Sequence, residues 1–424
     1  MKILHLNTYD IRGGAARAAY RIHAALRENG IQSEMIAARK DSQDSNVKAY
    51  HVRHQEKKIR FGKRLLSLQR SSNPILHSCN LFLSGIHQAI NRSDADIVHL
   101  HWLGHELISI AEVKKINKPI VWTLHDMWAF CGAEHYDDVS IPGRYRKGYK
   151  RENRPATHRG RIDIDAWTWR RKRKHWRHIN FNFVTPSRWL AGCLFESALF
   201  SPKKATVIPY CLNTDVFKPV DRPRGREQFN LSQDKQLILF GADGGGKNLL
   251  KGYHLLEKAL EYLADRGAAN TMECVVFGGK NEGRSVLKGI PVTAIKRIKD
   301  DNLLAMLYSA ADAFVAPSML DNLPNTVMEA MSCGTPCVGF RIGGIPDMID
   351  HQKNGFIARP FKTQELAEGI NWVISNSHRR NQLGREARKK VLASYHPNII
   401  AKQYLKLYRN ICKFGLDSEN FSRK

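Results

Sequence analysis

Residues 317–344 read PSMLDNLPNTVMEAMSCGTPCVGFRIGG, and this stretch carries the strongest signal of fold and function in the chain. Two acidic residues, Asp321 and Glu329, are separated by seven residues, and Pro324 lies between them. Because proline is favoured in the first turn of a helix, the pattern predicts a helix that begins near Pro324. The free N–H groups and positive dipole end of that helix would face the preceding loop and suit a phosphate. The stretch therefore predicts an anion site flanked by two hydroxyl-binding carboxylates, which suits a sugar nucleotide.

The same stretch resembles the E-x7-E region of retaining glycosyltransferases of family 4, which have the GT-B fold. Their usual form is P-S-x-x-E-G-F-P, four further residues, E-A-M-A-x-G-x-P-V and then G-G-x-x-E. Glu329 is kept here, whereas Asp321 stands for the first Glu, Asn322-Leu323 for Gly-Phe and Asp347 for the last Glu. An acidic loop before a buried helix, which is common in α/β proteins, is the alternative interpretation.

The rest of the chain alternates between strand and helix patterns. The apolar run KILHLN at residues 2–7 predicts the first strand, and a glycine turn and a helix at 15–29 follow it. The pattern restarts after residue 235 with QLILFGADGGGKNLLKG, a strand that leads into a glycine-rich loop. We predict further strands at residues 33–37, 97–101, 120–124, 181–185, 274–277, 313–316 and 336–339. This order predicts an α/β fold with parallel sheets covered on both faces.

The length of 424 residues exceeds one ordinary hydrophobic core, so we expect two domains. The resemblance implies two Rossmann-like domains that face a central cleft, as in GT-B proteins. We place an acceptor-binding domain at residues 1–212 and a nucleotide-sugar-binding domain at 213–395, with the boundary near 208–219. Residues 396–424 are expected to form a helix that crosses back to the first domain.

The net charge of +27 is unusually high, and residues 1–212 carry +18 of it. Such a charge implies an anionic partner: nucleic acid, anionic lipid or a polyphosphate substrate. No apolar run approaches the roughly 18 to 20 residues that span a bilayer, and the N-terminus reads as a strand and not as a secretory signal. We therefore expect a cytoplasmic protein. The eight cysteines lack metal-ligand spacing, so Cys333 and Cys337 are expected to be small buried residues, and we predict no metal site.

Transfer of a sugar from a nucleotide diphosphate requires cations and N–H groups that stabilise the departing diphosphate. Lys251, at a predicted loop-to-helix junction, matches the Lys of the family pattern G-R-L-x-x-x-K-G, and the resemblance implies that it binds this diphosphate. A solvated surface lysine is the alternative. The Arg of that pattern is absent because Ala242 follows Gly241, so Lys247 is a further candidate and Arg341 a weaker one.

Two further groups of residues are assigned to the donor site. Gly13 and Gly14 follow the first strand and open a helix, so their backbone could approach phosphates closely. The resemblance implies that this glycine loop lies under the donor diphosphate, that Glu329 binds the nucleotide ribose, and that Asp321 contacts the donor hexose. Backbone groups of Asn322, Leu323, Pro324 and Asn325 are expected to complete the pocket, and Gly343 and Gly344 to shape a neighbouring loop.

His125, in VWTLHDMW, ends a predicted buried strand, where α/β proteins place ligand-binding groups. It matches a family His that contacts the donor sugar and lines the reaction centre, and Asp126 would orient it or hold an acceptor hydroxyl. His99, His101 and Trp102 end the preceding predicted strand, where we expect a core or sugar-stacking role. Three histidines near strand ends could also suggest a metal, but no carboxylate or cysteine of recognised spacing accompanies them.

Two segments of the N-terminal half are rich in basic residues. Residues 144–177 hold fourteen Lys/Arg and three acidic residues, together with Trp167, Trp169 and Trp176. Residues 57–70, KKIRFGKRLLSLQR, have a basic amphipathic character. Interleaved Trp and cations suit the interface of an anionic membrane, although the same composition could bind RNA or form a solvated insertion. Because neither segment shows a nucleic-acid motif, we favour an anionic membrane surface over nucleic acid.

Together these features predict a retaining glycosyltransferase that moves a hexose from a nucleotide diphosphate sugar to a lipid-linked oligosaccharide. We expect it to be peripheral on the inner face of the cytoplasmic membrane and to serve bacterial surface polysaccharide biosynthesis (O-antigen of lipopolysaccharide, capsule or exopolysaccharide). The resemblance implies that it needs no metal and no cofactor besides the donor substrate. The alternatives are a nucleotide-sugar epimerase or hydrolase on the same fold, and a non-catalytic protein that binds an anionic ligand.

Overall fold

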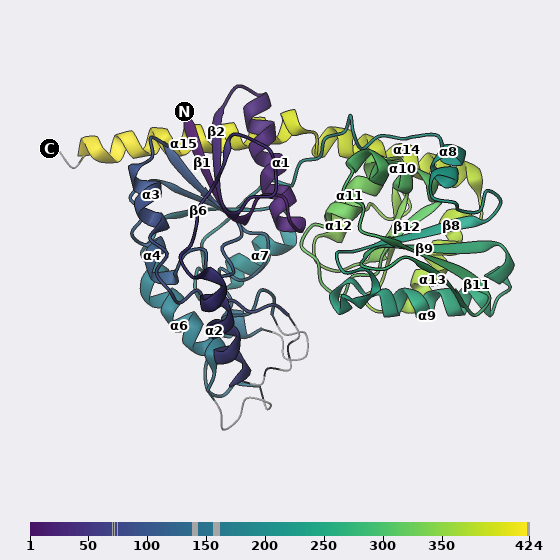
Figure 1. Cartoon of the computed structure of the whole chain (residues 1–424), viewed down its shortest axis with the longest axis horizontal. Helices are drawn as coiled ribbons and strands as arrows, with labels where there is room; N and C mark the ends of the chain where they lie inside the picture. Colours follow the sequence, from purple (N-terminus) through teal and green to yellow (C-terminus); the bar gives the residue numbers. More distant parts are fainter. Residues whose placement is uncertain (70, 72, 74, 138–142, 156–161, 422–424) are drawn as a thin grey trace. The chain divides into compact units, whose positions relative to one another are not determined.

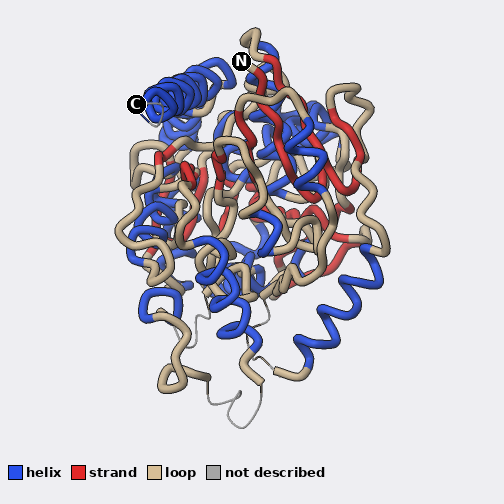
Figure 2. The backbone as a smooth tube through the Cα atoms, turned by 90° about the vertical axis from the view of Figure 1, so that its left-hand side faces the viewer, coloured by secondary structure: helices blue, strands red, loops and turns tan. Residues whose placement is uncertain are grey.

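The computed structural model describes residues 1–69, 71, 73, 75–137, 143–155 and 162–421. The chain divides into two compact units, one made of Met1–Pro209 and the chain from Ile400 onward, the other of Tyr210–Ile399. Each unit contains one seven-stranded sheet with helices packed around it (Figures 1 and 2). The predicted fold class, α/β with two Rossmann-like domains, is therefore confirmed.

The first sheet has the strand order β3-β2-β1-β4-β5-β6-β7, and all its neighbouring pairs are parallel. Its strands are β1 (Lys2–Tyr9), β2 (Gln32–Arg39), β3 (Val47–Ala49), β4 (Ile97–Leu100), β5 (Ile120–Thr123), β6 (Phe181–Thr185) and β7 (Thr206–Val207). The accompanying helices are α1 (Gly14–Glu28), α2 (Gln55–Ser67), α3 (Ile86–Arg92), α4 (Ile110–Val113), α5 (Arg144–Lys147), α6 (Ile164–Trp176), α7 (Arg188–Glu196) and α15 (Pro397–Phe421). Every residue of β4 and β5 is buried, as expected for parallel strands covered on both faces.

The second sheet has the order β10-β11-β9-β8-β12-β13-β14, in which only the β10–β11 pair is antiparallel among the described strands. Its strands are β8 (Gln236–Gly241), β9 (Met272–Gly279), β10 (Gly283–Leu287), β11 (Ile290–Lys296), β12 (Ala313–Ala316), β13 (Cys337–Phe340) and β14 (Gly355–Ala358). Its helices are α8 (Arg222–Gln228), η2 (Gly245–Lys247), η3 (Leu249–Lys251), α9 (Tyr253–Ala264), η4 (Ala268–Asn270), α10 (Asp301–Ala310), α11 (Asn325–Ser332), α12 (Ile345–Met348), α13 (Thr363–Ile374) and α14 (Ser377–Ser394). Figure 1 shows α8, α10, α11 and α14 on one face of this sheet and α9 and α13 on the other.

Both sheets reverse their strand order at one point, between β1 and β4 in the first unit and between β8 and β12 in the second. Open α/β sheets bind ligands beyond the carboxyl ends of the strands at such a switch point. The loops that follow these four strands contain Gly13, Trp102, Lys251 and Asp321. The topology therefore brings distant parts of the sequence to one edge of each sheet.

One detail of the second unit differs from the sequence-based expectations. The β10–β11 hairpin and β14 were not predicted, because their sequences lack a long apolar run. The helix predicted to begin near Pro324 is confirmed as α11, which begins at Asn325 with Pro324 as its N-cap residue. Within the described part of the chain, we find no helix that combines the length and the apolar character needed to cross a membrane.

Helix α15 packs on the first unit by its buried tyrosines. Tyr404 and Tyr408 are fully buried. The Tyr404 hydroxyl lies 3.0 Å from Thr123 Oγ1 and the Tyr408 hydroxyl 2.7 Å from His99 Nδ1. These bonds tie the end of the chain to the strands β4 and β5.

Candidate functional site

The loops after β8 and β12 are in direct backbone contact in the second unit. The Met319 N–H donates to the Leu250 carbonyl at 2.8 Å. Gly252 has a φ of +71°, and a Cβ atom placed on it would lie 1.9 Å from the Pro317 carbonyl oxygen. Only glycine combines this conformation with such a close approach, so the Lys-Gly junction that the sequence singled out is a packing requirement as well.

This contact brings together Lys251 and Asp321, which are seventy residues apart in the sequence. Lys251 Nζ lies 2.5 Å from Asp321 Oδ2, and the Ser318 hydroxyl lies 3.4 Å from the same oxygen. The Asp321 side chain is 10% exposed and that of Lys251 30%. The pair therefore forms a partly shielded cation and carboxylate at the carboxyl edge of the sheet.

Gly343 and Gly344 contact the backbone of Asp321 and fix its position. The Gly344 N–H donates to the Asp321 carbonyl at 3.1 Å. Gly343 has a φ of +57°, and a Cβ atom on it would lie 1.8 Å from the same carbonyl oxygen. A side chain at Gly343 would displace the Asp321 loop, so this pair contributes to the position of the carboxylate.

Helix α11 starts directly after this loop, and its N-cap residue Pro324 makes no side-chain capping hydrogen bond. The Pro324 carbonyl accepts from the Val327 and Met328 N–H groups at 3.2 and 3.3 Å. Asn322, Leu323 and Pro324 are buried, and Asn325 is half-buried. The helix N-terminus thus lies beside Asp321 and presents the positive end of its dipole there.

Glu329 lies one turn into α11 and is 3% exposed. The hydroxyl of Tyr308, on α10, donates to Glu329 Oε2 at 2.9 Å. Tyr308 is fully buried, and nothing in its local sequence, a helical apolar run, distinguished it as a site residue. The hydrogen bond fixes the orientation of the carboxylate that we expect to bind the ribose.

The other basic residues of the second unit that were predicted to bind the diphosphate are more exposed than Lys251. Lys247 ends the short helix η2 and is exposed, as is Arg341 after β13. Ala242, at the position of the family Arg, is 4% exposed and packs in the core of the unit. In the described structure, the only hydrogen bond or ion pair of a lysine or arginine to Asp321 is that of Lys251.

In the first unit, the predicted glycine turn precedes α1. Gly13 has a φ of +86° and a ψ of 168°, which favours glycine, and it is the N-cap residue of the helix. Gly14 begins the helix and is exposed. The first turn of α1 contains no acidic residue. The turn therefore presents an N-terminus with open space around Gly13, where a Cβ atom would meet nothing within 4 Å.

His125 follows β5 and joins a chain of imidazoles. His125 Nε2 lies 3.0 Å from His101 Nδ1, and His101 Nε2 lies 2.9 Å from His5 Nδ1. Burial lowers the pKa of His125 to about 4, although Asp126 opposes the shift. Burial also lowers the pKa of His5 and of His101 well below the ordinary value. All three imidazoles are therefore neutral at pH 7.

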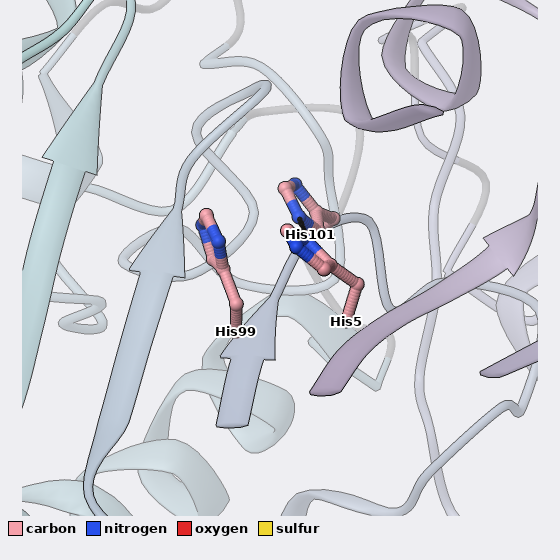
Figure 3. Close-up of side chains that lie close together, drawn as sticks. All are labelled: His5, His99 and His101. Atoms are coloured by element: carbon pink, nitrogen blue, oxygen red, sulfur yellow. Dashed lines mark hydrogen bonds between the residues drawn. The ribbon is translucent and has the colours of Figure 1, made fainter. Parts of the chain in front are cut away.

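His5, His99 and His101 lie close together (Figure 3), and one ring nitrogen of each comes within 4.8 Å of the others. Both nitrogens of His99 lie within hydrogen-bonding distance of Thr123 and Tyr408, at 2.7 Å each. Both nitrogens of His101 are likewise paired with other histidines. The arrangement fits a hydrogen-bonded core network, and we assign no metal to it.

Asp126 lies at the centre of a second network. Its Oδ2 atom accepts from Trp102 Nε1 at 2.9 Å and lies 2.6 Å from His135 Nδ1, while Oδ1 accepts from the Trp128 N–H. The Ser78 hydroxyl lies 2.8 Å from His135 Nε2. Burial alone would raise the pKa of Asp126, but the His135 imidazole and the hydrogen bonds lower it.

Sequence reasoning missed Ser78 and His135, because they lie 57 residues apart and match no local motif. Ser78, His135 and Asp126 lie in the order of a hydrolytic triad, but Ser78 is only 5% exposed. The cavity that His135 and Asp126 line has a volume of about 10 Å³, roughly that needed by one water. We therefore interpret this network as the support that positions Asp126.

The basic segment at residues 144–177 corrects one expectation. Trp169 and Trp176 are 6% and 0% exposed and belong to the core, so they do not form an interface with a membrane. Lys172 is fully buried, and its ammonium donates to the carbonyls of Trp128, Cys131 and Gly132. Residues 156–161 of this segment, and Arg70 at the end of the other basic segment, lie outside the described residues. Within the described residues, therefore, only part of this segment remains exposed to contact a membrane.

Two family models match separate parts of the chain. The one described as Glycosyltransferase Family 4 matches residues 12–216, and the one described as Glycosyl transferases group 1 matches residues 221–390. The chain is also 28% identical over 191 residues to an uncharacterized glycosyltransferase of Methanocaldococcus jannaschii, a match that covers 43% of this chain and 47% of the relative. The matched stretches span less than half the length of the first curated relatives.

Solved structures resemble the whole chain. Sucrose-phosphate synthase from Thermosynechococcus elongatus superimposes with a TM-score of 0.69 at 18% identity, over 97% of this chain and all of that one. The Anabaena protein HepE in complex with UDP-glucose superimposes with a TM-score of 0.65 at 15% identity, over 97% and 100% of the two chains. These likenesses support the fold, and the two family models together cover most of both units. The chain therefore belongs to the glycosyltransferases of family 4, with a GT-B fold of two Rossmann-like domains.

Proposed function

We propose that this protein transfers a hexose from a nucleoside-diphosphate sugar to a lipid-linked oligosaccharide, with retention of the anomeric configuration. The observation that carries the proposal is the Lys251–Asp321 pair beside the N-terminus of α11. A cation and a helix N-terminus together suit a diphosphate, and a neighbouring carboxylate suits sugar hydroxyls. The likeness to HepE, whose solved structure contains UDP-glucose, supports such a donor.

Departure of the diphosphate is the step in which these residues would act. Negative charge builds up on the leaving phosphate oxygens as the bond to the sugar breaks. The ammonium of Lys251, once the diphosphate has displaced Asp321 from it, and the first N–H groups of α11 would stabilise that charge. Glu329, held by Tyr308, would bind the ribose hydroxyls and set the position of the diphosphate relative to Lys251.

The Lys251–Asp321 bond has a consequence for donor binding. An incoming diphosphate would compete with Asp321 for the ammonium of Lys251. The released carboxylate would then be available for a hydroxyl of the donor hexose, which is the role implied by the family. Asp is one methylene shorter than the usual Glu, so we expect a donor preference that differs from that of relatives with Glu.

His125 would face the reacting sugar as a neutral imidazole. Because its pKa is lowered to about 4, it remains uncharged at the pH of the cell and can accept or donate one hydrogen bond. His101 and His5 fix its ring orientation through the imidazole chain. It would therefore orient a sugar hydroxyl and not add positive charge.

The test is a transfer assay with purified protein, radiolabelled UDP- and GDP-hexoses and membrane extracts that contain lipid-linked oligosaccharides. We expect the label to enter the organic-extractable lipid fraction with one donor, and NMR of the product to show the anomeric configuration of the donor. Release of free hexose, or conversion of the sugar nucleotide without any acceptor, would instead indicate a hydrolase or an epimerase. Absence of nucleotide binding would contradict the proposal altogether.

We further propose that the protein is peripheral on the inner face of the cytoplasmic membrane, in bacterial surface polysaccharide assembly, and that α2 contributes to membrane binding. On α2, Phe61 is 54% exposed, and Lys58 Nζ donates to the carbonyl of Leu83, which is 61% exposed. The exposed cations of α2 are Lys57, Arg60, Lys63 and Arg64. Exposed apolar groups among cations suit the headgroup region of an anionic bilayer.

Cosedimentation with phosphatidylglycerol liposomes at low salt tests the α2 surface. We expect the double variant Phe61→Ser/Leu83→Ser to bind less than the wild type. The matched control, Val286→Ser/Leu303→Ser, changes two exposed apolar residues of the second unit, at 69% and 36% exposure, and should bind normally. Equal binding of all three proteins would exclude α2 as the contact.

A further inference from the structure

A basic groove of about 830 Å³ lies in the second unit, away from the Lys251–Asp321 loops. It is lined by α14 and by the turn after α11, at Cys333 and Gly334. The Asp321 loop lies at the opposite end of α11, and that eight-residue helix is about 12 Å long. The groove is therefore separate from the Lys251–Asp321 loops, and Glu329 lies on α11 between the two.

Five residues that line this groove carry positive charge, and none of its described lining residues is acidic. The five cations are Arg222, Arg380, Arg385, Arg388 and Lys389. Such a cluster is costly unless its charge is balanced, because like charges at short range repel one another. The contacts of each cation show how much of the charge is balanced within the protein.

One buried carboxylate next to the groove, that of Asp312, forms ion pairs with three guanidinium groups. Asp312 Oδ1 lies 3.2 Å from Arg222 Nη1 and 2.8 Å from Arg380 Nη1, and Oδ2 lies 2.7 Å from Arg226 Nη2. The Asp312 side chain is only 3% exposed. Three positive charges around one negative charge leave an excess of positive charge next to the groove.

Two of these arginines also have an unsatisfied donor. The Nε atoms of Arg222 and Arg380 are buried and lack a hydrogen-bond partner among the described residues. A buried donor without an acceptor destabilises a structure, and an anion that enters the groove could supply the acceptor. Arg388, in contrast, donates to the carbonyls of Phe217 and Ser332 and therefore has a structural role.

The last two cations complete the electrostatic surface of the groove. Arg385 and Lys389 are exposed on α14, four residues apart, so they project from the same side of the helix. Lys389 is 3.8 Å from the exposed Glu386, a weak surface pair. Both side chains are free to reorient toward a bound anion.

We propose that this groove is a second ligand site, which binds a small molecule or headgroup that carries phosphate. The planar guanidinium fork matches phosphate oxygens, and a groove of this volume is large enough for more than an inorganic ion. Leu392 and Val220 add apolar surface to its wall, which suits a phosphate ester better than free phosphate. Neither Lys251 nor Asp321 lines this groove.

Isothermal titration calorimetry at fixed ionic strength tests the site with two probes, inorganic pyrophosphate and water-soluble dihexanoyl phosphatidic acid. The proteins are the wild type, Arg385→Gln/Lys389→Gln, Arg380→Gln and Lys251→Ala. We expect the groove double variant to bind roughly tenfold more weakly, since hydrogen bonds to charged groups contribute on this scale. The matched control Lys258→Gln/Lys353→Gln removes two charges elsewhere in the unit and should bind as the wild type does.

The design separates the two anion sites and the two ligand sources. Binding that survives Lys251→Ala but is weakened in the groove variants supports the proposal. Pyrophosphate binding that Lys251→Ala leaves intact indicates a free phosphate compound, and binding of phosphatidic acid alone indicates a lipid headgroup. The proposal is overturned if neither probe binds, or if the groove variants, shown by circular dichroism to be folded, bind like the wild type.

Discussion

Lys251 forms an ion pair with Asp321 in the candidate donor site, and Asp321 lies in the loop directly before α11. We predict that Lys251→Ala lowers kcat/KM for the donor by about 100-fold or more, since a donor to the leaving group is lost. Steady-state kinetics with saturating acceptor measures this change. Lys258→Ala, an exposed lysine of α9, is the control and should be unaffected. Wild-type turnover in Lys251→Ala would remove this lysine from the site.

Two variants of the Tyr308–Glu329 hydrogen bond can show whether Glu329 acts on donor binding or on the stability of the protein. Glu329→Gln keeps an acceptor for the Tyr308 hydroxyl but removes the charge, so we expect a donor KM about tenfold higher with little change in melting temperature. Tyr308→Phe leaves the buried carboxylate without this donor, so we expect the protein to be less stable by about 1 to 3 kcal/mol. Thermal unfolding and donor titration of both variants distinguish the two effects. Equal donor affinity in Glu329→Gln and wild type would contradict the ribose assignment.

At the scale of elements, the site depends on the packing of the η3 loop against the β12 loop. Gly252→Ala would place a Cβ atom 1.9 Å from the Pro317 carbonyl oxygen, so the two loops must move apart. We predict that this variant loses donor binding and unfolds at a lower temperature than the wild type. Gly267→Ala is the matched control, because Gly267 has a φ of +89° but no atom within 4 Å of its added Cβ. If both variants behave alike, backbone strain and not the clash explains the effect.

At the scale of the whole molecule, buried histidines make stability depend on pH. Burial lowers the pKa of His23, His105 and His125 to about 4, and that of His5, His99 and His101 well below 6.5. Unfolded histidines bind a proton near pH 6.5, so between about pH 6.5 and 4 the unfolded chain holds more protons than the folded one. Stability is therefore full above pH 6.5 and is lost as the pH falls, by about 1.4 kcal/mol per pH unit for each proton.

Urea unfolding between pH 5 and 8, followed by tryptophan fluorescence, measures this dependence, because seven of the eight tryptophans lie in residues 1–209. We expect His105→Asn to reduce the slope by about one proton, since Asn tolerates the φ of +57° at this position. The exposed His51→Gln is the control and should keep the wild-type slope. A stability that does not change between pH 7 and 5 would contradict the neutral state of these imidazoles.

The sequence by itself determined the α/β class and the restart of the pattern after residue 235, and it singled out Lys251 and the Asp321–Glu329 region as separate site candidates. These features are local: strand and helix periodicity, glycine and proline signals and a contiguous motif are all visible within a few tens of residues. The tertiary structure decided the partners of these residues. Tyr308 beside Glu329 and His135 beside Asp126 come from separate elements, and no spacing in the sequence indicates such contacts.

The tertiary structure also decided which charged and aromatic residues remain on the surface. Trp169 and Trp176 read as interfacial side chains among cations, yet α6 turns them into the core. In the second unit, Arg222 and Arg380 come from α8 and α14 and meet only because both reach Asp312. The composition gives only the amount of charge in the chain. The location of the charged residues depends on which helix faces pack against a sheet, and this packing forms only when distant elements come together.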